Sequence, residues 1–196
     1  MKSTFGTIAR APLPALSTFV VSGLLAASLL FAPAAHAVIV DPDNPSEAVA
    51  ADQYPALVDK LIHRGQTREA LEIIDEALSK NPLSVQLRFQ RCVAYERMGE
   101  TQRAAELYED FITRYPEVPE PYNNLASIYA KTGNLDRAQE LVERSLALRP
   151  SFALAYANLG QIHLAKARNA FASALSNNPG DKAAQAKLKA IDALLK

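Results

Sequence analysis

Three residue types recur in strict register along this chain, and this recurrence constrains its fold more than any other feature. A glycine, an alanine five residues later and a proline twelve residues after the alanine stand together three times. The three sets are Gly65, Ala70 and Pro82, then Gly99, Ala104 and Pro116, then Gly133, Ala138 and Pro150. Because each set is displaced from the next by 34 residues, the pattern indicates stacked copies of one supersecondary unit.

The residues around these positions predict that the unit is a pair of helices. Ala, Leu, Glu, Arg and Gln are abundant between residues 51 and 179, and all of them favour helices. Apolar residues recur at three- and four-residue spacing on both sides of Gly133, which is typical of two amphipathic helices. Gly133 suits the end of the first helix, where a left-handed backbone is needed, and Pro150 suits the end of the second.

The stretch PYNNLASIYAKTGNLDRAQELVERSLALRP, residues 121–150, resembles a tetratricopeptide repeat (TPR), a helix–turn–helix unit with a 34-residue period. The matching residues are Tyr122, Leu125, Tyr129, Gly133, Ala138 and Pro150. The resemblance divides the chain into TPR 1 at 51–84, TPR 2 at 85–118 and TPR 3 at 119–152. It implies an all-α fold, a TPR-like α-solenoid of antiparallel helix pairs with a C-terminal capping helix.

Residues 153–180 resemble a shortened, degenerate fourth repeat. Tyr156 and Leu159 match the start of the third repeat, but the proline comes at Pro179, five residues early, and the missing stretch is the glycine turn. Apolar positions keep helical phase through the join, so we expect residues 153–176 to form one long helix, or at most a kinked one. Residues 181–196 predict the capping helix, with Asp181 as its N-cap, over the open end of the stack.

The first 37 residues have the features of a secretory signal peptide. Lys2 and Arg10 precede a mostly apolar stretch at 16–32, and Ala35-His36-Ala37 predicts cleavage after residue 37. An uncleaved membrane anchor is the alternative, although the apolar run is marginal for a span of about 20 residues. Residues 38–50, rich in Pro, Asp, Asn and Ser, predict a flexible lead-in. We expect an exported, periplasmic protein in a bacterium, with no membrane contact after cleavage.

The remaining chain offers little to catalysis or to nucleic acid. Cleavage would remove two basic residues and leave the protein nearly neutral, without the basic excess of a nucleic-acid binder. His63 and His163 fall in different repeats, and metal sites need several ligands together. Cys92 stands at a tight helix crossing and predicts a small buried residue, not a nucleophile. We therefore predict no catalytic residue, no metal site, no cofactor and no enzymatic activity.

In a TPR stack the first helix of each pair lines a concave groove, and the resemblance implies a partner-binding site there. The residues predicted to line it are Phe89, Gln90, Val93, Arg97, Asn123, Asn124, Ser127, Lys131, Asn158 and Gln161. Asn124 and Asn158 stand 34 residues apart, with Gln90 at the same place in TPR 2, so they predict an amide ladder for the main chain of an extended peptide. The alternative is that these amides cap local backbone or face water.

These features predict a non-catalytic adaptor or scaffold in the bacterial cell envelope that binds another protein or an extended peptide in its groove. A self-assembling structural subunit is one alternative, because a second copy could cover the long helix and the capping helix if they do not bury each other's apolar stripes. A membrane-tethered assembly factor is another, and it requires residues 16–32 to be retained.

Overall fold

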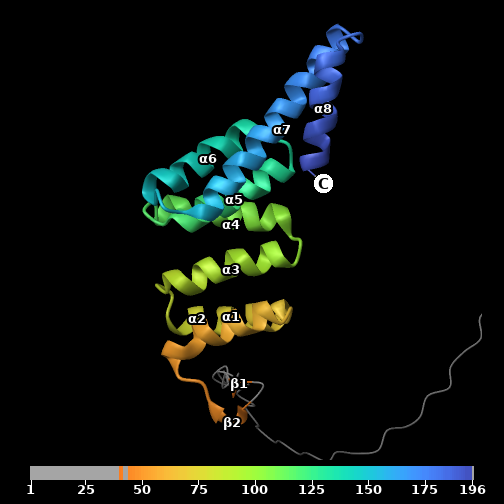
Figure 1. Ribbon diagram of the computed structural model, residues 1–196. Helices are drawn as coiled ribbons and strands as arrows, with labels where there is room; N and C mark the ends of the chain where they lie inside the picture. Colours follow the sequence, from red (N-terminus) through yellow and green to blue (C-terminus); the bar gives the residue numbers. More distant parts are fainter. Residues whose placement is uncertain (1–39, 42–43, 196) are drawn as a thin grey trace, which may run out of the picture. The chain divides into compact units, whose positions relative to one another are not determined.

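The computed structural model describes residues 40–41 and 44–195, which fall within one compact unit, His36–Lys196. The predicted signal peptide and its cleavage site lie outside the described residues. A 3-10 helix at Ala51–Gln53 leads into the helices shown in Figure 1. They are α1 (Tyr54–His63), α2 (Thr67–Lys80), α3 (Val85–Arg97), α4 (Thr101–Arg114), α5 (Pro119–Lys131), α6 (Leu135–Leu148), α7 (Ala153–Asn177) and α8 (Lys182–Leu194).

The first six helices form three hairpins, each closed by one of the recurring glycines. Gly65, Gly99 and Gly133 have φ values of 76°, 78° and 85°, a left-handed conformation that strains any residue with a Cβ atom. After Gly133, the main-chain N–H of Asn134 donates to the carbonyl oxygen of Tyr129 at 2.9 Å. This bond spans the turn and satisfies one of the last carbonyl groups of α5.

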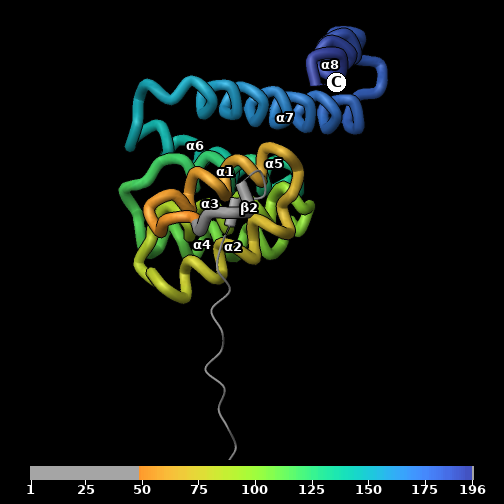
Figure 2. Tube along the Cα trace, turned by 90° about the horizontal axis from the view of Figure 1, so that it is seen from below, coloured from red at the N-terminus to blue at the C-terminus, as the bar shows by residue number. Residues whose placement is uncertain are grey.

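The hairpins stack in chain order, as Figures 1 and 2 show. The second helix of each pair packs on the first helix of the next, and α1 also contacts α3 as α5 contacts α7. The first helices α1, α3, α5 and α7 therefore form one layer, which we call the first-helix layer. The all-α repeat fold predicted by the 34-residue register is confirmed.

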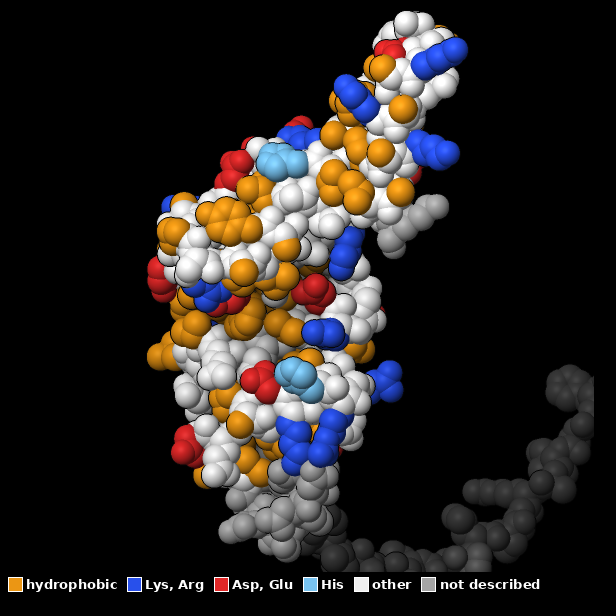
Figure 3. All heavy atoms as spheres, viewed as in Figure 1, with side chains coloured by type: hydrophobic (Ala, Val, Ile, Leu, Met, Phe, Trp, Pro, Cys, Tyr) orange, Lys and Arg blue, Asp and Glu red, His pale blue; other side chains and the backbone are white. Residues whose placement is uncertain are grey.

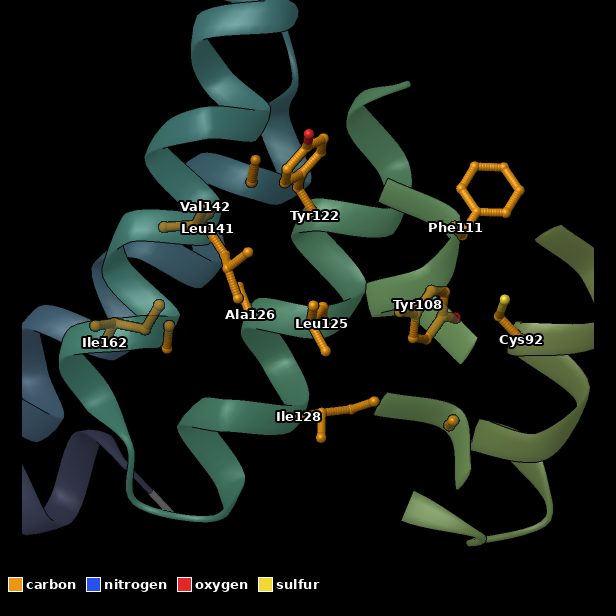
Figure 4. Packing of buried hydrophobic residues seen from close by; sticks show 13 residues of the cluster. Cys92, Tyr108, Phe111, Tyr122, Leu125, Ala126, Ile128, Leu141, Val142 and Ile162 are labelled. Carbon is orange, nitrogen blue, oxygen red and sulfur yellow. The ribbon is translucent and has the colours of Figure 1, made fainter. Parts of the chain in front are cut away.

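The recurring alanine lies at the centre of each hairpin. Ala70, Ala104 and Ala138 are fully buried, because the two helices of a pair approach most closely there. Figure 4 shows the cluster built by α4, α5 and α6, in which Leu125 and Val142 pack together. Burying side chains of this size contributes about 1.5–3 kcal/mol each, so stability comes from these repeated positions.

Beyond α6 the hairpin pattern ends. Residues Ala153–Asn177 form one 25-residue helix, α7, in which only Ala155 and Ile162 are buried. The chain then turns back into α8, whose N-terminus is capped by Asp181: its Oδ1 accepts from the main-chain N–H groups of Ala183 and Ala184, both at 3.0 Å. Figure 2 shows α8 beside the distal part of α7.

The segment expected to be a flexible lead-in has structure of its own. Strands β1 (Val40–Asp41) and β2 (Asn44–Ala48) pair antiparallel, with Val40 opposite Ala48 and Asp41 opposite Asn44. Composition predicts flexibility from side chains, whereas this pairing is a main-chain interaction. The expectation of a flexible 38–50 is corrected to that extent, and the helical fold is unchanged.

Candidate functional site

A pocket lies in the first-helix layer where α5 meets α7. Its volume is about 440 Å³. Its lining residues are Ser127, Ala130, Lys131, Leu135, Asn158, Gln161, Ile162, Ala165 and Leu195. Four of the ten residues predicted from the sequence are among them: Ser127, Lys131, Asn158 and Gln161. Leu195, just after α8, closes one side, so the end of the described chain reaches the predicted groove.

Side-chain amides link this pocket to the interior through a line of hydrogen bonds, which we call the amide relay (Asn158, Asn123, Asn124, Tyr108 and Glu96). Asn158 Nδ2 donates to Asn123 Oδ1 at 2.8 Å, and Asn123 Nδ2 donates to Asn124 Oδ1 at 3.4 Å. Asn124 Nδ2 donates to the Tyr108 hydroxyl at 3.0 Å, which donates to Glu96 Oε2 at 2.8 Å. Every donor points the same way, towards the Glu96 carboxylate.

The relay depends on Tyr108 remaining protonated. Burial raises the pKa of the Tyr108 hydroxyl well above its usual value, and the nearby negative charge of Glu96 raises it further. The phenol therefore stays a donor to Glu96 and an acceptor from Asn124 at any physiological pH. A fully paired buried network of this kind holds its members in one arrangement.

Two predicted contact residues are internal instead. Gln90 is 4% exposed, and its Nε2 donates to Pro55 O at 2.8 Å and to Asp59 Oδ1 at 2.6 Å, which ties α3 to α1. Asn123 is 1% exposed and joins α5 to α7 through Asn158. We correct both assignments: an amide between successive first helices uses its hydrogen bonds on the neighbouring repeat. The predicted ladder is thus a set of bonds between repeats.

The remaining predicted residues divide between core and surface. Phe89 packs on α4, with its ring centroid 6.3 Å from that of Tyr108 and 5.8 Å from that of Phe111. Val93 is half-buried against the cluster of the first hairpin. Arg97 is exposed at the end of α3. Only the α5–α7 part of the predicted groove therefore combines open volume with polar groups.

Two components of the site were missed from the sequence. Tyr108 stands where the other repeats have Ile74 and Val142, and a hydroxyl at a core position needs a partner, so this substitution was a readable signal. Leu195 had none, because its place depends on the direction in which α8 returns.

No catalytic arrangement is present in the part of the chain that the structure describes. Within it, no group of three or more His, Cys, Asp or Glu side chains is arranged to hold a metal ion. Cys92 is buried and its Sγ donates to Arg88 O at 3.3 Å. Burial raises the pKa of the Cys92 thiol to about 12, which leaves it an unreactive thiol. None of the described helices is both long and apolar enough to cross a membrane.

Comparison with known proteins returned two matching family models, each described as a tetratricopeptide repeat. One matches residues 56–119 and the other matches residues 95–162, so together they span more than half of the chain. A comparison with curated proteins returned no match.

Solved structures show the same fold at low sequence identity. The first TPR domain of human RPAP3 aligns with a TM-score of 0.55 and 21% identity over 60% of this chain and 92% of that one. Pseudomonas aeruginosa pilF aligns at 0.53 and 20% over 72% of this chain and 67% of that one. The second TPR domain of human RPAP3, solved with the HSP70 peptide SGPTIEEVD, aligns at 0.51 and 18% over 58% and 94%.

Proposed function

Because this chain belongs to the tetratricopeptide repeat family, we propose that it is a non-catalytic adaptor that holds an extended segment of a partner protein in the pocket between α5 and α7. TPR folds are protein–protein interaction modules and generally act as scaffolds without chemistry of their own. The observation that carries the proposal is the 440 Å³ pocket, where amide, cationic and apolar side chains converge.

The pocket has the groups that an extended peptide needs. Asn158 uses one N–H on Asn123, and its carbonyl oxygen and second N–H can pair with the N–H and C=O of a bound main chain. The amide relay already holds Asn158 in place, so binding costs less side-chain entropy. Ile162 and Ala165 offer apolar contact, and the Lys131 ammonium favours a partner carboxylate nearby. A neighbour of the same fold, the second TPR domain of RPAP3, holds a peptide with acidic residues.

Peptide selection tests this proposal directly, because the pocket then chooses its own ligand. A random peptide library is selected against the purified protein, and the best peptide is titrated by fluorescence anisotropy. We expect Asn158→Ala and Gln161→Ala each to weaken binding by at least about tenfold, the loss of one or two hydrogen bonds. Asn169→Ala, an exposed amide on α7 outside the pocket, is the matched control and should bind like wild type. Equal affinity of all three variants would remove the pocket from the account.

We further propose that the adaptor works in the bacterial envelope after export. The proposal is supported by the charged, apolar and small-residue order of residues 1–37. N-terminal sequencing of the protein from its host should begin at Val38. A chain that begins at Met1 would favour the alternative, an assembly factor tethered by residues 16–32.

A further inference from the structure

Helix α7 is a repeat from which the turn has been deleted. Before the join its residues follow the third repeat at a distance of 34, as Tyr156 follows Tyr122. After the join the distance is 29, as Ala167 follows Ala138 and Phe171 follows Val142. The five missing residues correspond to 130–134, the segment that turns α5 into α6 around a left-handed glycine.

In the third repeat, these positions bury one another. The Ser145 hydroxyl donates to Pro119 O at 2.8 Å, which sets the antiparallel register of α5 and α6. That register places Ala138 opposite Ala126, both fully buried, and Val142 opposite Tyr122. The first repeat buries the equivalent residues in the same way: Tyr54, Leu57, Val58, Ala70, Ile74 and Ala77.

In α7 the same positions are open. Tyr156 is 56% exposed. Gly160, the equivalent of Ala126, is exposed, and a Cβ atom added to it would meet nothing within 4 Å. Ala174, the equivalent of Ser145, is exposed as well, and Ala167 is only half-buried. Both sides of a hairpin interface are therefore present, but one straight helix cannot fold them together.

The deletion brings these two sides onto one face of α7. At 3.6 residues per turn, Gly160 and Ala167 are seven residues apart and differ by about 20° around the helix. Tyr156 and Ala174 are 18 residues apart, about five full turns. We call the face formed by both halves the α7 stripe (Tyr156, Gly160, His163, Ala167, Phe171 and Ala174).

We infer that the α7 stripe is the interface between two copies of this chain, whose α7 helices pack antiparallel about a two-fold axis. In that pair Gly160 meets Ala167 of the second copy, and Ala167 meets its Gly160, as Ala126 meets Ala138 in the third repeat. Tyr156 likewise meets Phe171 of the second copy. The stripe is thus complementary to itself, the requirement for a closed two-fold interface, and each copy restores the hairpin packing that the other lacks.

The charges on α7 permit this approach. Lys166 Nζ lies 2.7 Å from Asp136 Oδ1, and Arg168 Nε donates to Asp192 Oδ1 at 2.7 Å. Both cations are therefore neutralised within their own chain. Helix α8 binds another side of α7, through Arg168 and through Lys187, whose ammonium lies 5.2 Å from the centre of the Phe171 ring. Figure 3 shows hydrophobic side chains gathered over α7 and α8.

The pairing is independent of the peptide pocket. Asn158 and Gln161 lie on the side of α7 that borders α5, away from the α7 stripe, so a dimer would carry two open pockets. Peptide binding and self-association can therefore fail separately.

Mass measurement tests the inference. Light scattering after size exclusion, from about 1 to 200 µM of the purified protein, should give twice the chain mass at the upper end. We expect Gly160→Glu to be monomeric throughout, with unchanged helical circular dichroism, because an exposed helical glycine tolerates the substitution in the single chain. Asn169→Glu, exposed outside the stripe, should remain dimeric. A wild-type monomer at every concentration, or a Gly160→Glu dimer, would overturn the inference.

Cysteine cross-linking checks the register. In a Cys92→Ala background, the pair Gly160→Cys and Ala167→Cys should oxidise to a covalent dimer. Within one chain these positions are about 10 Å apart along the helix axis, too far for a disulfide. The pair Gly160→Cys and Asn169→Cys should give no covalent dimer across the same contact. Equal yields from both pairs, or none from the first, would exclude the antiparallel register even if the protein dimerises.

Discussion

The third repeat and α7 use nearly the same sequence pattern and reach opposite outcomes. In the third repeat, Ala126 and Ala138 lie on two helices and are fully buried. In α7 their equivalents, Gly160 and Ala167, lie on one helix and remain accessible. The residues that pack the hairpin are present in both regions, and the difference is the five-residue turn. The turn therefore decides whether a repeat closes on itself or offers its packing surface to another chain.

Restoring the turn should have the largest effect. Insertion of Ala-Lys-Thr-Gly-Asn, the sequence of residues 130–134, between His163 and Leu164 should convert α7 into a hairpin and bury the α7 stripe within one chain. We expect a monomer at about 100 µM and a larger urea m-value, since more surface is exposed on unfolding. The same insert with alanine in place of glycine is the control and should be less effective. A dimer after insertion of the glycine-containing turn would contradict the comparison.

Truncating equivalent leucines should separate the two regions next. Leu125→Ala removes a fully buried side chain and should lower the free energy of unfolding by about 2–5 kcal/mol. Leu159→Ala, its equivalent in α7, removes a half-buried side chain and should cost about 1 kcal/mol or less at low protein concentration. Urea unfolding at about 1 µM measures both. Equal losses would mean that the first half of α7 is packed as tightly as α5.

The amide relay should contribute more than an ordinary tyrosine hydrogen bond. Tyr108→Phe removes a buried hydroxyl that joins Asn124 to the Glu96 carboxylate and should cost about 2 kcal/mol of unfolding free energy. Tyr122→Phe removes one bond to Pro116 O at 3.2 Å and should cost about 0.5–1 kcal/mol. Similar values for the two variants would show that the relay is not coupled.

Two glycines should respond with opposite signs, although by smaller amounts. Gly133→Ala forces a Cβ atom into a left-handed backbone and should cost about 1–2 kcal/mol of unfolding free energy. Gly160→Ala places the same methyl group on an exposed helical position and should stabilise the monomer by about 0.5–1 kcal/mol. Thermal or urea unfolding of the two variants decides the sign, and a loss at both positions would mean that Gly160 is not an ordinary helical residue.

The contrast also explains what could be read from the sequence. The turns at Gly65, Gly99 and Gly133 follow from backbone sterics, which are local, so the 34-residue register predicted the hairpins. Whether an amide faces a partner depends on the neighbouring repeat, and for that reason Gln90 and Asn123 were placed on the surface when they are internal. The place of Leu195 depends on the path of α8, which no repeat position encodes.

Site-specific photo-cross-linking in living cells tests partner binding in the pocket most directly. A photoreactive residue is placed at Gln161, which lines the pocket, and in a second strain at Arg144, an exposed residue of α6 outside it. We predict a covalent adduct with a different protein from position 161 and none from position 144. No adduct at position 161, or the same adducts at both positions, would contradict the account.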